Sequence, residues 1–230
     1  MSAAVVVNGE KPVEKLDGEE EQNETDEMYK ALDTAKTAPK VSIEQSLKHP
    51  LNSRWCLWYF INDKNLAWED SQIKVASYGT VEDFWALFNH IESASKLRVG
   101  CDYSLFKQGI KPMWEDSANI NGGRWSISVP KNQRFTELDD LWMEMIMMMV
   151  GENEEECVNQ DICGAVVAVR PRNGRLALWT ANGRNAELAL KVGCCLKNTL
   201  SIPPNHSIEF NLHSDTSVKR SSTVRALYTV

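Results

Sequence analysis

Residues 163–180, CGAVVAVRPRNGRLALWT, consist of two apolar runs on either side of a Pro-Arg-Asn-Gly segment at 171–174. Asn-Gly between two such runs is a strong hairpin signal, because both residues tolerate the positive φ angles of a tight turn. Residues 163–170 and 175–180 are therefore predicted to be neighbouring strands of an antiparallel sheet.

Other segments extend this sheet and place helices between its strands. Aromatic and β-branched residues or alternating patterns predict further strands, at 54–61, 73–78, 103–106, 124–129, 207–213 and 224–230. Helices are predicted at 80–91, 136–150 and 185–200. Thr80 and Asp83 are expected to cap the first helix, and Gly151 to end the second. This order indicates an α+β fold in which helices cover one face of the sheet and leave the other open.

Charge is distributed unevenly along the chain, whose net charge is −7. Residues 1–40 hold ten acidic and five basic residues, and they are predicted to form a disordered acidic tail. Residues 41–230 are predicted to form one folded domain. Within it, residues 163–225 hold nine bases against three acids. Such a basic region is either a local anion site or simply a solvated face.

Several classes of protein are not favoured. The six Cys residues form no C-x-x-C pair, the four His residues lack metal-ligand spacing, and residues 152–156 look like a solvated acidic loop. We therefore expect no metal, and reduced thiols as in a cytoplasmic protein. The longest purely apolar run, 55–61, has seven residues, which is too short to span a membrane. Motifs of phosphate-binding loops, nucleophile elbows and metal-binding helices are absent from the sequence, which argues against an enzyme.

Tryptophan is unusually frequent, with eight residues, and two of them occur in Trp-Glu-Asp triplets at 68–70 and 114–116. An indole face attracts a flat cationic ring, and a neighbouring Glu can accept two N–H bonds from the edge of that ring. Arg170, Arg172 and Arg175 flank the predicted turn and suit phosphate oxygens. A single Trp is more often a core residue, but the combination indicates a site for a cationic ring with a phosphate tail.

Six segments, in order along the chain, resemble the eukaryotic translation initiation factor 4E family of messenger-RNA cap-binding proteins. They read KHPL at 48–51, TVEDFW at 80–85, GCDYSLF at 100–106, PMWED at 112–116, GGRW at 122–125 and CGAVV at 163–167. The resemblance covers residues 47–230. It implies a curved, cupped sheet of eight antiparallel strands with three long helices on its convex face, and a cap-binding domain in the predicted range 41–230.

The resemblance also implies the residues of a cap site on the concave face. The 7-methylguanine ring would lie between Trp68 and Trp114, with Glu115 accepting from its N1–H and amine groups and the Trp114 backbone N–H donating to its O6. Trp179 would contact the N7 methyl group. The basic residues that would hold the phosphates are Arg124, Arg170, Arg172 and Arg175. Among these, Arg124 and Arg172 match supporting positions of the family.

A second implied site, on the convex face, would bind partners that carry a Tyr-x-x-x-x-Leu-apolar helix. These are the scaffold factor 4G and the repressor 4E-binding proteins. From helical periodicity alone, Trp85 is a core residue of helix 80–91, whereas the resemblance leaves it on the surface. Met143 stands where the family commonly has Leu. The residues that match this groove are His49, Pro50, Val81, Trp85, Met143 and Gly151.

The implied function is a cytoplasmic, non-enzymatic factor that binds capped messenger RNA and recruits it to the translation initiation complex through 4G. It would act without a cofactor, as a monomer within a larger complex. The alternative is a cap-binding paralogue that represses translation or has a specialised role because it engages 4G weakly. Ser222 matches a regulatory phosphorylation position of the family, although a loop serine without that role fits the sequence equally well.

Overall fold

The computed structural model describes residues 48–67, 70–152, 154–218 and 225–230. These residues form a curved antiparallel sheet whose eight strands have the order β2-β1-β3-β5-β6-β4-β7-β8. The strands are β1 (Pro50–Phe60), β2 (Gln72–Thr80), β3 (Asp102–Lys107), β4 (Gly123–Pro130), β5 (Ile162–Val169), β6 (Asn173–Thr180), β7 (Glu209–Leu212) and β8 (Tyr228–Thr229). The predicted α+β class and eight-stranded sheet are confirmed.

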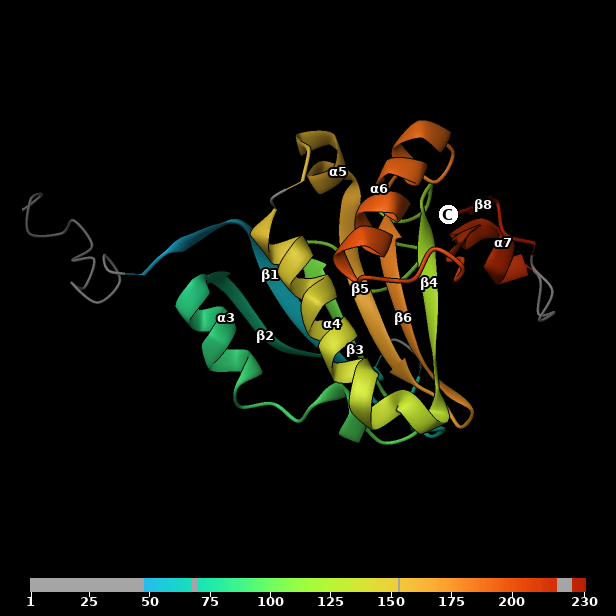
Figure 1. The fold of residues 1–230 in the computed structure, drawn as a ribbon. Helices are drawn as coiled ribbons and strands as arrows, with labels where there is room; N and C mark the ends of the chain where they lie inside the picture. The colour runs from blue at the N-terminus through green and yellow to red at the C-terminus, as the bar shows by residue number, and fades with distance from the viewer. Residues whose placement is uncertain (1–47, 68–69, 153, 219–224) are drawn as a thin grey trace, which may run out of the picture. The chain divides into compact units, whose positions relative to one another are not determined.

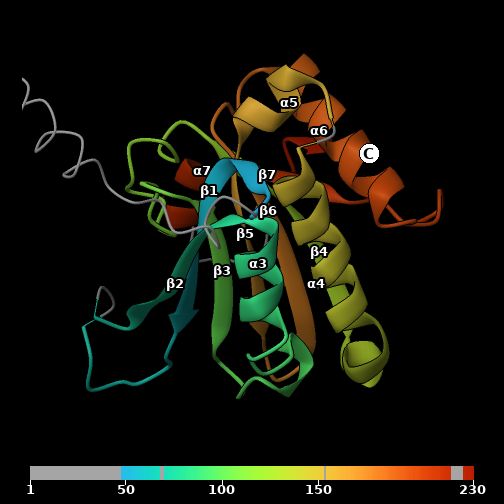
Figure 2. The same ribbon diagram turned by 90° about the vertical axis from the view of Figure 1, so that its left-hand side faces the viewer.

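Three long helices cover one face of this sheet, as predicted (Figures 1 and 2). Two shorter helices are absent from the sequence-based expectation: α5, at the top of Figure 1, and α7, beside β8 at its right. Single turns of 3₁₀-helix occupy Ala94–Lys96 and Lys131–Gln133. The helices are α3 (Val81–Phe88), α4 (Arg134–Gly151), α5 (Glu156–Asp161), α6 (Ala186–Thr199) and α7 (His213–Val218).

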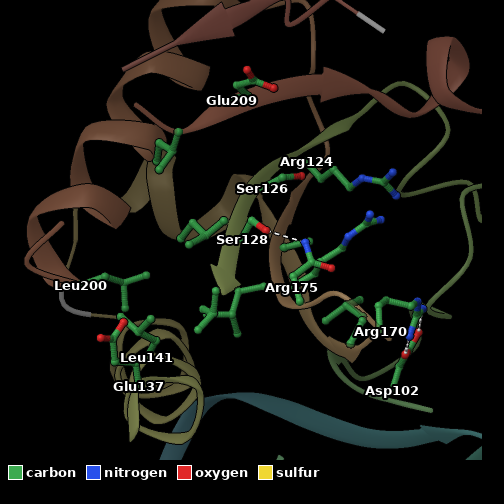
Figure 3. A pocket seen from close by; sticks show the side chains of 18 of the residues that line it. Asp102, Arg124, Ser126, Ser128, Glu137, Leu141, Arg170, Arg175, Leu200 and Glu209 are labelled. Carbon is green, nitrogen blue, oxygen red and sulfur yellow. Dashed lines mark hydrogen bonds and ion pairs between the residues drawn. The ribbon is translucent and has the colours of Figure 1, made fainter. Parts of the chain in front are cut away.

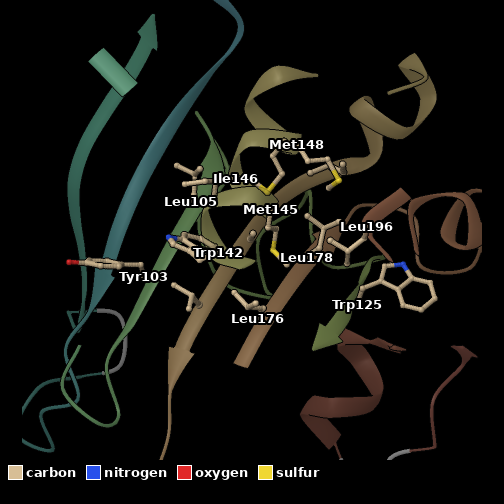
Figure 4. Packing of buried hydrophobic residues seen from close by; sticks show 14 of the residues in the cluster. Tyr103, Leu105, Trp125, Trp142, Met145, Ile146, Met148, Leu176, Leu178 and Leu196 are labelled. Atoms are coloured by element: carbon tan, nitrogen blue, oxygen red, sulfur yellow. The ribbon is translucent and has the colours of Figure 1, made fainter. Parts of the chain in front are cut away.

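The main core lies between α4, α6 and the sheet (Figure 4). Met145 and Ile146 of α4 and Leu178 of β6 are fully buried in this core. Trp125 of β4 is also fully buried, and its Nε1 donates to the Ala189 carbonyl of α6 over 3.1 Å. A buried indole N–H needs such a partner, so this bond fixes α6 on the sheet.

The hairpin of β5 and β6 exists, but its turn is not at Asn-Gly as predicted. Arg170 N donates to the Asn173 carbonyl over 2.9 Å, so Pro171 and Arg172 are the central turn residues. Asn173 and Gly174 already belong to β6, where Gly174 pairs with Val169. A Cβ atom on Gly174 would lie 2.9 Å from Leu138 Cδ1 of α4. This glycine therefore permits close helix–sheet packing rather than a turn.

α4 ends at Gly151 as predicted, but Gly151 does not take the left-handed conformation of a capping glycine. Gly151 is the last helical residue, and Glu152 takes the left-handed position that follows, with φ of 45°. The acidic stretch after it contains α5, and Asp161 at the end of α5 is buried. Its carboxylate accepts from Asn182 N and Nδ2 over 2.9 and 2.7 Å. Part of this stretch is therefore structural, which charge alone did not indicate.

The predicted cap of α3 is present and gives a test of local stability. Thr80 Oγ1 accepts from Asp83 N over 3.2 Å and donates to the Asp83 carboxylate over 2.7 Å. We expect Thr80→Ala to lower the free energy of unfolding by about 1 kcal/mol, because both bonds are lost. Thr80→Ser keeps the hydroxyl and should cost less than about half of that. Urea unfolding checks this, and equal losses in the two variants would contradict the cap.

Candidate functional site

A cavity of about 1300 Å³ hollows the open face of the sheet and extends past β4 to residues of α4 (Figure 3). Its floor is formed by β3, β4, β5 and β6, and the loop between β3 and β4 contributes Pro112, Met113 and Trp114 to its wall. The predicted site residues that the structure brings together around this cavity are Trp114, Arg124, Arg170, Arg175 and Trp179.

Strand register explains why residues from distant parts of the chain meet here. Arg124 of β4 pairs with Trp179 of β6, and Ser128 of β4 pairs with Arg175 of β6. Paired residues project to the same face of a sheet, and the next residue along projects to the other face. The neighbouring Trp125, Leu176 and Leu178 accordingly have no exposed surface and lie in the core. Basic and aromatic groups are thus collected on the open face.

The loop that carries Trp114 is held in shape by two side chains that the sequence analysis did not single out. The Asp116 carboxylate accepts from the backbone N–H groups of Lys111 and Ala118, each over 3.0 Å. Asn119, which is fully buried, donates from Nδ2 to the Lys111 and Met113 carbonyls over 3.0 and 2.8 Å. Trp114 itself remains 40% exposed, so an ordered loop presents its indole face to solvent.

Arg170 is anchored at one side of the cavity by a bidentate pair with Asp102 of β3 (Figure 3). Its Nη2 donates to Asp102 Oδ2 over 2.8 Å, and its Nη1 donates to Oδ1. This bond raises the pKa of Arg170, whereas burial raises the pKa of Asp102. The carboxylate of Asp102 therefore offsets the guanidinium charge, and the pair holds Arg170 in a fixed orientation.

Arg124 and Arg175 have no such counter-charge within the described part of the chain. Figure 3 shows both guanidinium groups extending to the same side of β4 and β6. Burial and the neighbouring Arg175 lower the pKa of Arg124, because both disfavour its charged form. A bound anion would relieve that repulsion, and phosphate oxygens match the planar guanidinium groups. This part of the cavity is therefore suited to a phosphate group.

Trp179 lies between two other rings. Phe106 of β3 meets it edge-on at a centroid distance of 5.4 Å, and His213 of α7 lies against it at 4.1 Å with an interplanar angle of 39°. His213 is 1% exposed, and burial, with a smaller effect of Arg124, lowers its pKa from 6.5 to about 3. The ring behind Trp179 is thus a neutral imidazole, which the sequence analysis did not identify.

The remaining predicted site residues are less closely gathered. Glu115 and Arg172 are exposed and do not line the cavity. Trp68 and Ser222 lie outside the residues that the structure describes, as does the predicted tail. Their assigned roles stay predictions.

The predicted partner-binding residues lie on the helix-covered face. The carbonyl of His49 accepts from Val81 N over 2.9 Å, and Pro50 pairs with Thr80, so the start of β1 lies beside the start of α3. Val81 and Trp85 are 38% and 39% exposed, so the core position favoured by periodicity alone is wrong for Trp85. On α4, Met143 is half-buried and Gly151 is exposed.

Met147 extends this surface and was not predicted to belong to it. It lies one helical turn from both Met143 and Gly151 and is 44% exposed. Positions four apart share one face of a helix, so an apolar residue midway between the predicted contact positions 143 and 151 was the signal available in the sequence.

The residues that the structure describes lack two further features. No helix among them has the length and apolar character required to cross a lipid bilayer. The same residues contain no cluster of three or more His, Cys, Asp or Glu side chains that could hold a metal ion.

Comparison with known proteins gives a consistent result. Residues 50–227 match the family model of eukaryotic initiation factor 4E. The chain is 48% identical over 184 residues to eukaryotic translation initiation factor 4E of Aplysia californica, covering 80% of this chain and 85% of that protein.

Two solved structures resemble this chain in both fold and sequence. Ascaris suum eIF4E-3, in a complex with the m2,2,7G cap, has a TM-score of 0.75 and 43% identity, covering 80% of this chain and 99% of that one. C. elegans eIF4E-3, in a complex with the 4E-binding protein Mextli and a cap analogue, has a TM-score of 0.73 and 43% identity over the same shares.

The neutral His213 behind Trp179 predicts how stability depends on pH. Below pH 6.5 the unfolded state binds a proton at this residue and the folded state does not, until the pH approaches 3. Stability therefore falls with decreasing pH, with a slope from this group of about 1.4 kcal/mol per pH unit. His213→Phe keeps an aromatic ring and removes the titration. Between about pH 6 and 4 the wild type should lose free energy of unfolding faster than this variant; parallel losses would contradict the assignment.

Proposed function

This chain belongs to the eukaryotic initiation factor 4E family, and we propose that it binds the 7-methylguanosine cap of messenger RNA in the cavity on its open face. One observation carries the proposal: the cavity combines an exposed indole, Trp114, with the guanidinium groups of Arg124, Arg170 and Arg175. An aromatic surface for a cationic ring and a basic surface for phosphates are the two features that a cap requires.

The methylated guanine stacks on Trp114 in this proposal, with Trp68 as the opposite wall. Glu115 follows Trp114 directly and is exposed, which supports its role as acceptor for the N1–H and amine groups of the ring. Trp179 lies at the cavity wall, 7% exposed, where it can meet the N7 methyl group. Methylation at N7 makes the ring cationic, so stacking and cation–π attraction act together.

The phosphates of the cap bind along the Arg side of the cavity. Arg124 and Arg175 supply guanidinium groups that form no ion pair in the described part of the chain, and Arg170 supplies an oriented guanidinium held by Asp102. Arg172, at the exposed tip of the hairpin, is placed to attract the following phosphates at longer range. This arrangement binds its ligand without bond making or breaking, so we propose a non-enzymatic factor.

We further propose that the helix-covered face recruits partners while the cap is bound. Val81, Trp85 and Met147 expose apolar surface there, and an amphipathic helix docks in such a groove through its apolar face. The complex of C. elegans eIF4E-3 with Mextli supports a 4E-binding protein as one partner. Scaffold factor 4G is proposed as the other, which would bring capped messenger RNA to the translation initiation complex in the cytoplasm.

Repression of translation is the second candidate function. The observation that favours it is the presence of Met residues on the exposed side of α4. Met143 and Met147 form the α4 side of the groove, and unbranched thioether side chains adapt to many surfaces without specifying one. Equal pull-down of 4G and of a 4E-binding protein, with rescue of cap-dependent translation, would exclude weak 4G engagement. Capture of the repressor alone would favour it.

Trp114 and Trp85 are equally exposed, at 40% and 39%, and form a matched pair of variants. Trp114→Ala should weaken binding of 7-methyl-GTP by about tenfold or more, because it removes one stacking surface, and should leave binding of a Tyr-x-x-x-x-Leu-apolar peptide unchanged. Trp85→Ala should have the opposite pattern, since a buried aromatic anchor dominates such an interface. Fluorescence titration of both ligands measures this. Loss of both activities in either variant would contradict separate faces.

The phosphate assignment predicts a dependence on ligand length. Arg175→Ala should weaken binding of 7-methyl-GTP by about tenfold, because the phosphates lose a charge-assisted hydrogen bond. Binding of the nucleoside 7-methylguanosine, which has no phosphates, should be nearly unaffected. Arg184→Ala, at an exposed position outside the cavity, is the control. Calorimetry with both ligands tests the point, and an equal loss for the nucleoside would refute the role of Arg175 as a phosphate ligand.

A further inference from the structure

The cavity does not end at the cap site but continues around the edge of β4 onto the helix-covered face. There it is lined by residues of α4 and of the segment after α6, among them Leu141, Leu200 and Ile202 (Figure 3). Ile127, on the core side of β4, also lines it. Leu141, Ile202 and Ile127 are only half-buried, so this extension has an apolar floor that is accessible to solvent. We call it the β4-edge groove.

The edge of β4 beside this groove is open over part of its length. β7 pairs with β4 from Gly123 to Ser126 and no further. From Ile127 to Val129, β4 is paired with β6 on one side only, among the residues that the structure describes. Ser128 and Pro130 are exposed. A strand edge of this kind presents free backbone groups to which an extended segment can add.

The balance of charge differs across this edge. On the open face the cavity is lined by Arg124, Arg170 and Arg175, and by two acids, Asp102, which is paired with Arg170, and Glu209 of β7. On the helix face its rim is formed by Glu137 and Glu144 of α4, with Asp140 between them, all exposed and without an ion pair in the described part of the chain. Positions 137, 140 and 144 lie on one face of α4. The groove therefore repels phosphates and attracts cations, which disfavours the body of the RNA as its occupant.

We propose that the β4-edge groove binds an extended, basic and apolar segment of a partner protein as an additional strand beside Ile127–Val129. Side chains of an added strand alternate between the faces. Those on the helix face would be apolar or basic, to match Ile127, Leu141 and the acidic rim. Those on the open face would be small or polar, to match Ser126 and Ser128. This surface is distinct from the one around Trp85 and goes beyond the proposed cap and helix-binding functions.

The test uses a fluorescein-labelled peptide, Ser-Lys-Ser-Ile-Ser-Lys-Ser-Val, titrated against the full chain by fluorescence anisotropy. Two control peptides carry Glu in place of Lys, or N-methyl groups on alternate backbone nitrogens. The Lys peptide should bind and should protect backbone amides in 127–129 from hydrogen exchange. The Glu peptide should not bind, because the rim is acidic, and the N-methylated peptide should not bind, because strand pairing is blocked.

Paired protein variants separate the groove from overall charge. Glu137→Lys/Glu144→Lys reverses two rim charges, and Glu92→Lys/Glu187→Lys changes net charge equally at exposed positions outside the cavity. Each pair also replaces one acid in the first turn of a long helix, Glu137 of α4 or Glu187 of α6. The first pair of substitutions should weaken binding of the Lys peptide by about tenfold or more, and the second pair should weaken it by less than about twofold.

Several outcomes would overturn the proposal. They are failure of the Lys peptide to bind, equal losses in the two paired variants, and undiminished binding of the N-methylated peptide. Protection of the same amides by an uncapped oligonucleotide would assign the edge to RNA, and concentration-dependent protection without peptide would assign it to a second copy of this chain. Protection that disappears when residues 219–224 are replaced by Gly and Ser would assign it to this chain itself. Trp114→Ala should retain peptide binding, so failure of cap binding is distinguishable from failure of this proposal.

Discussion

The antiparallel pairing of β4, β6 and β5 is the constraint on which the rest of the structure depends. Because successive side chains alternate between faces, one strand contributes both to the core and to the candidate site. In β6, Leu176 and Leu178 enter the core, while Arg175 and Trp179 line the open face. A one-residue slip in register would exchange these sets. Close packing of Gly174 on Leu138 and the bond from Trp125 to Ala189 oppose that slip from the helix side.

The Trp residues that the structure describes have different environments. Trp55, Trp125 and Trp142 fill the core, whereas Trp85 and Trp114 expose their rings on opposite faces of the sheet. Trp179 has an intermediate role, because it is buried yet lines the cavity. The two Trp-Glu-Asp triplets are likewise not equivalent. Asp116 shapes the loop that presents Trp114, through bonds to two backbone N–H groups, and Asp70 is exposed.

Much of this arrangement could be predicted from the sequence, because it follows from local patterns and specific motifs. The strands, the cap at Thr80 and the Arg residues around the hairpin belong to that group. The shift of the turn to Pro171–Arg172 could not be predicted, because the close approach of Leu138 to Gly174 is a contact between distant segments. His213 and Asn119 were missed for a related reason. Their importance arises from burial and from partners that only the folded chain brings together.

The central claim is that the open face recognises a cationic guanine through Trp114 and its charged surroundings. Calorimetric titration of the wild-type chain with 7-methyl-GTP and with GTP tests it most directly, because the two ligands differ only in the methyl group and the positive charge that it confers. Cation–π attraction predicts that the methylated nucleotide binds at least about tenfold more tightly. Equal affinities would contradict the account, since the phosphates alone would then explain binding.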